Sequence, residues 1–176
     1  MGKITAIPLP TNSFLNAATQ QTGCYADCFE VAVPCTPLKD DLEAYFARYV
    51  FVFFDSWVFR LERRILRLAG KEGTHHEDIA ALARAETGRM AAWITRERGQ
   101  AELLLAVPDT PILTWLQVAQ TDSALLLRFG SGILPQTDKS RPHWGFRATY
   151  WAHRVYSRVL LHAAQADWAR GKDMPK

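Results

Sequence analysis

The stretch PHWGFRATYWAHRVYSRVLLHAAQADWAR, residues 142–170, carries the strongest periodic signal in the chain. Its apolar side recurs at helical spacing, at Trp144, Ala148, Trp151, Val155, Val159, His162 and Ala166. The opposite side carries Arg147, Arg154 and Arg158. An amphipathic helix needs an apolar surface to pack against. The pattern therefore predicts one long helix that buries the first set and leaves the arginines in solvent.

The segment just upstream predicts the surface that this helix covers. Alternating apolar and polar residues indicate four strands, at 89–97, 100–107, 112–120 and 123–133. Parallel crossovers need longer links than these strands have, since Arg98-Gly99 and Thr121-Asp122 fit two-residue hairpins. We therefore expect an antiparallel meander.

One strand and two or three helices complete the predicted domain. Residues 25–33 alternate, so that Tyr25, Asp27, Phe29, Val31 and Val33 share a face. Helical patterns run from an N-cap at Thr36 to about Tyr49, from Asp55 or Ser56 to Gly70, and from Thr74 to about Glu86. Residues 1–24 predict an irregular lead-in, and 25–171 a single domain. The fold class is α+β, an antiparallel sheet curled around a long C-terminal helix, with the shorter helices inserted after the first strand.

Length and composition limit the function. The chain has 176 residues, of which 48% are hydrophobic, enough for one domain with a sizeable core. Its formal charge of +3 is far below the basic density of nucleic-acid binders, so we expect no nucleic-acid partner. The most apolar window, 49–59, is too short to span a bilayer and contains Asp55. We expect a cytoplasmic protein without a transmembrane segment, and the oligomeric state stays open.

The cysteines and most histidines suggest no chemistry. Cys24, Cys28 and Cys35 form an odd set, and the first two lie roughly 13 Å apart on a strand, too far for a disulfide. Buried, reduced thiols are the expectation. His143 and His153 fit solvent-facing or helix-start positions.

Two short motifs have simple structural explanations. His75-His76-Glu77-Asp78 gathers metal-competent side chains, but Thr74 and Glu77 fit a capping box and the spacing is not His-Glu-x-x-His. Gly130-Ser131-Gly132 lacks the flanks of a nucleophile or phosphate loop and indicates a strand end where the sheet bends or the backbone passes close to another element. We therefore assign no catalytic residue, no metal site and no cofactor.

A small apolar ligand is the leading functional hypothesis. Trp93, Trp115 and Trp151 come from two strands and the long helix, and a curled sheet could gather them around a pocket. Ordinary core packing is the alternative for these tryptophans. Arg128 stands among leucines, so it either reaches water or anchors the polar end of a ligand. The expected ligand-binding residues are Tyr25, Trp93, Trp115, Arg128 and Trp151.

Two other functional classes stay open. A cyclase- or dehydratase-like enzyme could use the same cavity, with Asp27 or His162 as its acid or base. Core packing is the simpler role for His162. An interaction module could dock on a membrane surface or a protein through the run 49–59 and the arginines that follow, although a solvated helix face is the simpler interpretation. These arginines are Arg60, Arg63, Arg64 and Arg67.

The order of elements resembles a known architecture. A strand, helices, an antiparallel meander and a long last helix are similar to the helix-grip fold of START-related and polyketide-cyclase-like proteins. That resemblance implies a sheet of seven strands wrapped around the last helix with an apolar cavity between them, where the pattern here indicates five strands, or six with 3–7. Segments such as YADCFEVAVP (25–34) and TWLQVAQTDSALLLRFGSGI (114–133) also resemble uncharacterised bacterial proteins.

Overall fold

The computed structural model describes residues 2–21, 23–34, 41–68, 75–135 and 143–174, with side-chain placement for 57–61 and 64 of α3 and from 151 onward in α5. The described chain forms one antiparallel sheet of seven strands in the order β1-β2-β7-β6-β5-β4-β3, which confirms the α+β class. The strands are β1 (Thr5–Ala6), β2 (Tyr25–Pro34), β3 (Arg89–Met90), β4 (Trp93–Arg98), β5 (Glu102–Ala106), β6 (Ile112–Gln120) and β7 (Ala124–Ile133). The helices are α1 (Phe14–Ala18), α2 (Leu42–Phe54), α3 (Trp57–Leu68), α4 (His76–Ala83) and α5 (His143–Ala169).

The meander follows the prediction with small shifts. The predicted strand 89–97 is divided into β3 and β4, because Ala91 adopts a left-handed conformation with φ 48° and turns the chain. The two hairpin turns come later than predicted. The Gly99 amide donates to the Glu102 carbonyl at 2.8 Å, and the Thr121 amide donates to the Ala124 carbonyl at 2.8 Å.

Two helices begin later than the sequence pattern suggests. The N-cap of α2 is Asp41, whose carboxylate accepts from the Ala44 amide at 3.0 Å, while the predicted cap Thr36 lies outside the described residues. At α4 the His75 amide donates to the Asp78 carboxylate at 2.8 Å. The predicted capping box began at Thr74, which also lies outside the described residues.

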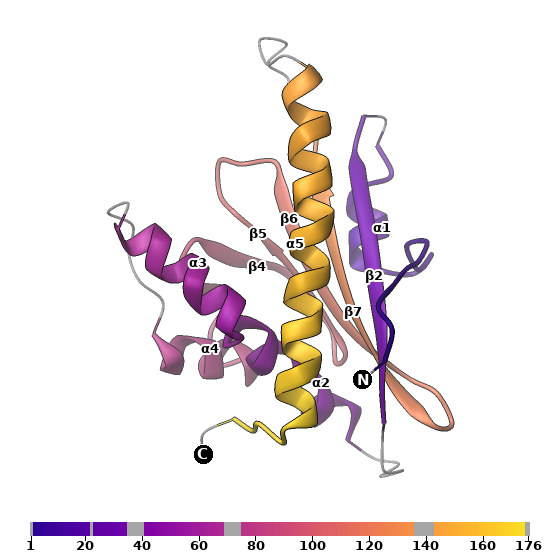
Figure 1. Cartoon of the computed structure of the whole chain (residues 1–176), viewed down its shortest axis with the longest axis vertical. Coiled ribbons are helices and arrows are strands. Elements are labelled where there is room, and N and C mark those ends of the chain that lie inside the picture. The colour runs from indigo at the N-terminus through magenta and orange to yellow at the C-terminus, as the bar shows by residue number, and fades with distance from the viewer. Residues whose placement is uncertain (1, 22, 35–40, 69–74, 136–142, 175–176) are drawn as a thin grey trace.

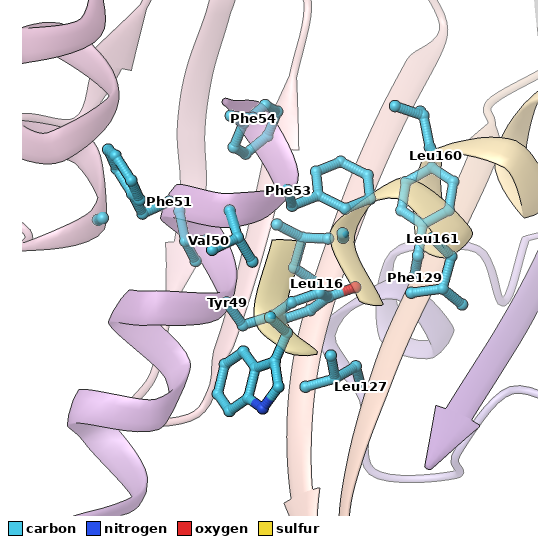
Figure 2. Packing of buried hydrophobic residues seen from close by; sticks show 14 of the residues in the cluster. Tyr49, Val50, Phe51, Phe53, Phe54, Leu116, Leu127, Phe129, Leu160 and Leu161 are labelled. Carbon is cyan, nitrogen blue, oxygen red and sulfur yellow. The ribbon is translucent and has the colours of Figure 1, made fainter. Parts of the chain in front are cut away.

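The main core lies between one face of the sheet and helices α2 to α5 (Figure 1). Helix α5 runs across this face and packs on β2 and β7. Figure 2 shows side chains from α2, β6, β7 and α5 converging in this core, with the rings of Phe53 and Phe129 4.9 Å apart. Helix α2 is the centre of the core, since every residue from Tyr49 to Phe54 is buried. Residues 49–54 are therefore not available as a docking surface, while Trp57 of the same run is 54% exposed.

A second core occupies the other face of the sheet, under α1 and the N-terminal segment. Its buried members are Leu15, Cys28, Leu104, Leu113 and Trp115. A Cβ on Gly130 would lie 2.7 Å from Leu15 Cδ2, so the strand must carry glycine to admit α1. The close backbone approach predicted for this glycine motif is confirmed. The predicted irregular lead-in is wrong in this respect, because it holds α1 and β1.

Helix α5 presents a different face to the sheet from the one predicted. Trp151, Val155, Val159 and His162 are exposed, although their stripe was expected to be buried. The side that packs on the sheet carries Ser157, Leu160, Leu161, Ala163, Ala164 and Trp168. Small residues at positions 157, 163 and 164 let the helix approach the sheet closely, and this outweighs the larger apolar side chains on the outer stripe.

Candidate functional site

A polar row crosses the helix-facing side of the sheet at one level. Strand register places Asp27 beside Ser131, Ser131 beside Thr114, Thr114 beside Leu105, and Leu105 beside Thr95. The neighbouring row towards the core is apolar, with Phe29, Phe129, Leu116 and Leu103 in register. The polar row therefore marks where the hydrophobic core ends.

Helix α5 adds polar groups above the same part of the sheet. His153 Nε2 lies 4.0 Å from Asp27 Oδ1 and 3.4 Å from Ser157 Oγ. The Ser157 hydroxyl donates to the His153 carbonyl at 2.9 Å. On the sheet, the Tyr25 hydroxyl donates to Asp27 Oδ2 at 3.1 Å. These contacts place the His153 imidazole and the Tyr25 hydroxyl beside the Asp27 carboxyl, and the Ser157 hydroxyl beside His153.

The carboxyl of Asp27 has an unusual electrostatic environment. Its side chain is 10% exposed. Burial raises the pKa of Asp27 above its usual value, and His153, the Tyr25 hydroxyl, Arg154 and the Ser131 amide offset only part of this effect. A buried carboxyl that keeps its proton more readily can donate a hydrogen bond or take part in proton transfer.

Several buried polar atoms on this face have no hydrogen-bond partner among the described residues. They are Asp27 Oδ1, Trp93 Nε1 and Thr95 Oγ1. Buried polar groups in proteins are nearly always bonded, and an unbonded one costs about 1–3 kcal/mol. Trp93 and Thr95 lie on β4, with three strands between them and Asp27 on β2, so the three atoms indicate two separate places where water or a ligand completes the hydrogen bonding.

The five predicted ligand-binding residues do not lie together. Tyr25 and Trp93 face the helices, and the Trp93 ring is 5.4 Å from that of Phe59 on α3. Trp115 is fully buried in the second core, on the other face, where its Nε1 donates to Glu102 at 2.5 Å. Trp151 is on α5 but 70% exposed. The three tryptophans therefore do not wall one pocket.

Arg128 is also on the face away from α5, because the register pairs it with Glu30 and Gln117. Its guanidinium donates to the Glu30 carboxylate at 2.7 Å and to Gln117 Oε1 at 2.8 Å. The arginine is thus held by the strands on either side, which corrects its expected place beneath the helix. The alternation along β7 puts Arg128 on the same face as Gly130, but the sequence could not show which face meets the helix.

The other sequence candidates have structural roles. Burial raises the pKa of the Cys28 thiol to about 12, so it stays protonated, and Cys24 is also a free thiol. Cys35 lies outside the described residues. No group of three or more metal-competent side chains occurs in the described part of the chain. His76 of the histidine motif binds Asp55 instead, at 3.2 Å.

Within the described residues, two surface grooves border α5. One, of about 650 Å³, lies between the end of α5 and the ends of β2 and β7, and Val33, Ala124 and Trp168 are among its lining residues. The other, of about 490 Å³, lies between α5, Trp57 of α3 and residues 2–4. Neither includes the polar row. None of the described helices meets the length and apolarity that a membrane crossing requires.

Sequence reasoning found Asp27 and Tyr25 but missed the other members of the polar row and His153. Thr95, Thr114 and Ser131 come from three strands, and only register aligns them. His153 was expected in solvent, since it lies outside the apolar stripe of its helix. A polar residue on the apolar parity of each strand was the available signal, and it was visible in Asp27, Thr114 and Ser131.

Comparisons with protein-family models, with curated proteins and with solved structures find no match to this chain. The resemblance to helix-grip proteins therefore stays a prediction. A function must be argued from the geometry around Asp27.

Proposed function

We propose that this protein binds a small, mostly apolar molecule between the sheet and the N-terminal half of α5, with a polar group of the ligand at Asp27. The observation that carries the proposal is the buried, unbonded Asp27 Oδ1 at the end of a polar row on an otherwise apolar face. Ligand sites in proteins typically combine apolar walls with a few convergent polar groups.

The chemistry of the row suggests what the ligand carries. Asp27 accepts hydrogen bonds when ionised and donates one when protonated, while Ser131 and Thr114 can do both. Adjacent strands are about 4.8 Å apart, so Asp27 and Thr114 are separated by roughly 10 Å. A ligand of that length with a hydroxyl or amino group at one end fits this spacing. Arg128 does not contact the proposed ligand, because its side chain is on the face of the sheet away from α5.

Binding can be tested by comparing two carboxamide variants on one strand. Asp27→Asn changes the candidate site, while Glu30→Gln removes a carboxylate on the other face, beside Arg128. A panel of apolar amines, alcohols and acids is screened by thermal shift, and molecules carried through purification are identified by native mass spectrometry. We expect ligands that raise the melting temperature of the wild type and of Glu30→Gln.

Asp27→Asn should weaken the amine ligands by about 10- to 100-fold, the loss of one charge-assisted hydrogen bond. Calorimetric titration measures this difference. If no molecule in the panel binds, or if the two variants weaken binding equally, the proposal is wrong.

An enzyme using Asp27 as an acid or base is the second candidate, and the raised pKa of Asp27 favours it. The arrangement is not a nucleophilic triad, because Asp27 and Ser157 both approach the same nitrogen of His153. Proton transfer is the chemistry that these groups support. A ligand that is turned over by the wild type and bound unchanged by Asp27→Asn would favour the enzyme over the binder.

A further inference from the structure

The outer surface of α3 and α5 exposes large apolar side chains. Trp57 and Leu61 of α3 are 54% and 51% exposed, and Trp151 of α5 is 70% exposed. Val155 and Val159 continue the α5 stripe, one and two turns after Trp151. A contiguous apolar surface of this kind marks an interaction site in many proteins.

Two of these residues, Trp57 and Val159, line one groove between the helices. The groove of about 490 Å³ has Trp57 of α3, Val159 of α5 and Ile4 of the N-terminal segment on its walls. Helices α3 and α5 also contact each other directly. Trp57 and Val159 therefore meet where the two helices join, with Leu61 further along α3 and Trp151 and Val155 further along α5.

The charged groups around this surface are basic. Arg60 and Arg64 of α3 and Arg158 of α5 are exposed, and Lys3 and Arg158 both line the groove. Among residues 57–61, 64 and 151–162, whose side chains the structure describes, none is acidic. Apolar side chains framed by arginines match the boundary between acyl chains and anionic headgroups.

We propose that the Trp57/Leu61/Trp151 surface docks on an anionic lipid bilayer, with Arg60, Arg64 and Lys3 at the headgroups. A second copy of the chain is the less suitable occupant. A two-fold dimer through this surface would place the same arginines opposite one another without an acidic partner on the described part of the surface. Residues 49–54 of the segment that sequence analysis offered for docking are buried, so that segment contributes to this surface through Trp57 and the residues that follow it.

The test is co-sedimentation of the purified chain with phosphatidylcholine vesicles that contain about one third phosphatidylglycerol, and with pure phosphatidylcholine vesicles. We expect binding to the anionic vesicles that weakens as salt rises from about 0.05 M to 0.5 M, because salt screens the headgroup attraction. Binding to pure phosphatidylcholine should be much weaker. No sedimentation with anionic vesicles at low salt would overturn the proposal.

Two double variants separate the charge from its position. Arg60→Gln with Arg64→Gln should lower the partition onto anionic vesicles about 30-fold, as expected for two basic groups at a charged surface. Arg89→Gln with Arg96→Gln removes the same charge from exposed positions on β3 and β4 and should leave most of the binding intact. Equal losses in the two double variants would show a nonspecific charge effect and contradict the proposal.

The apolar contribution is tested by Trp57→Ser with Leu61→Ser. Both side chains are about half exposed, so the variant should lose some stability with the buried half of each side chain. Its vesicle binding is measured well below its melting temperature, where it should fall at least tenfold. Millimolar inorganic phosphate should not displace the wild type from vesicles. Displacement by phosphate together with full binding of the serine variant would indicate an anion site and not a bilayer. Sedimentation velocity without lipid provides the last check, since a dimer that the serine variant abolishes would assign the surface to a second copy.

Discussion

Asp27, beside His153 of α5, and Asp55, near the C-terminal end of that helix, differ in how completely they are partnered. Asp55 lies near the C-terminal end, where Lys172 Nζ is 2.7 Å from its carboxylate and His76 Nδ1 is 3.2 Å away. Burial acts to raise the pKa of Asp55, yet Lys172 and His76 hold it below its usual value. At Asp27 burial prevails and the pKa is raised.

This difference separates a structural cluster from a candidate site. Lys172 also donates to the Asp55 carbonyl and to Asp167, while Arg48 donates to the Lys172 and Trp168 carbonyls, so the cluster ties the C-terminal residues to α2. A carboxylate with a complete set of partners stabilises the fold. The unfilled position at Asp27 is available to a ligand, at some cost to stability.

The largest expected effect comes from breaking the closed cluster. Lys172→Met should lower the free energy of unfolding by about 2–3 kcal/mol, because it leaves Asp55 and Asp167 buried without their common cation. The value stays below that of a fully buried pair, since the Lys172 side chain is 26% exposed. Urea unfolding at neutral pH measures it, with the exposed Lys3→Met as a control. A loss no greater than that of the control would contradict the structural role.

The pH dependence of this variant has a definite sign. The folded-state pKa of Asp55 is below its unfolded value of about 3.8, so its stabilising effect is complete above pH 4 and is lost as the pH falls through the folded pKa. The difference in free energy of unfolding between the wild type and Lys172→Met should therefore become smaller in acid. A gap that stays constant down to the onset of acid unfolding would show that Lys172 acts through packing alone.

The next effect in size concerns the strand behind Asp27. A Cβ at Gly130 would come within 2.9 Å of Trp115 Cε3 and 3.0 Å of the Asp27 carbonyl. Gly130→Ala should lower the free energy of unfolding by about 1–3 kcal/mol, because neither contact can yield freely. Combining it with Leu15→Ala should cost less than the sum of the two single changes, as a double-mutant cycle in urea would show. If the two losses in free energy of unfolding simply added, the new Cβ at position 130 would not be clashing with Leu15.

Asp27→Asn should change the free energy of unfolding by less than Gly130→Ala does, and should raise it. The folded-state pKa of Asp27 is raised, so its contribution to stability is complete below about pH 3.8 and is lost as the pH rises through the folded pKa. The asparagine side chain of the variant cannot ionise, so the variant should gain up to about 1 kcal/mol over the wild type at neutral pH and nothing in acid. Unfolding free energies at several pH values test this. A variant less stable than the wild type at neutral pH would mean that the carboxylate is well satisfied.

The smallest change is expected at the far end of the polar row. Thr95→Val keeps the shape of the side chain and removes the unbonded Oγ1, so stability should stay within about 1 kcal/mol of the wild type or rise slightly. A matched Thr121→Val removes a hydroxyl that donates to the Ala124 carbonyl at 3.0 Å and should be destabilising. Thermal unfolding distinguishes the two. A larger loss at Thr95 than at Thr121 would show that the Thr95 hydroxyl is bonded through water.

Much of the fold could be predicted because the relevant signals are local. The alternation of β2 and β6 and the short links of the meander specify antiparallel neighbours with few choices. The register that aligns Asp27, Ser131 and Thr114 could not be predicted, because hairpin turns one or two residues later than expected realign every cross-strand pair. The face of α5 that packs on the sheet could not be predicted either, since both sides of the helix carry apolar residues.

The amino-acid sequence by itself determined the class of the fold, the long last helix, the alternation of β2 and the close approach at Gly130, since each depends on neighbours along the chain. Tertiary structure alone decided which side of α5 meets the sheet, that Arg128 and Trp115 face away from it, and that His153 stands over Asp27. Those outcomes depend on how separate elements pack and where burial leaves a polar atom without a partner, and no periodicity within one segment encodes that choice.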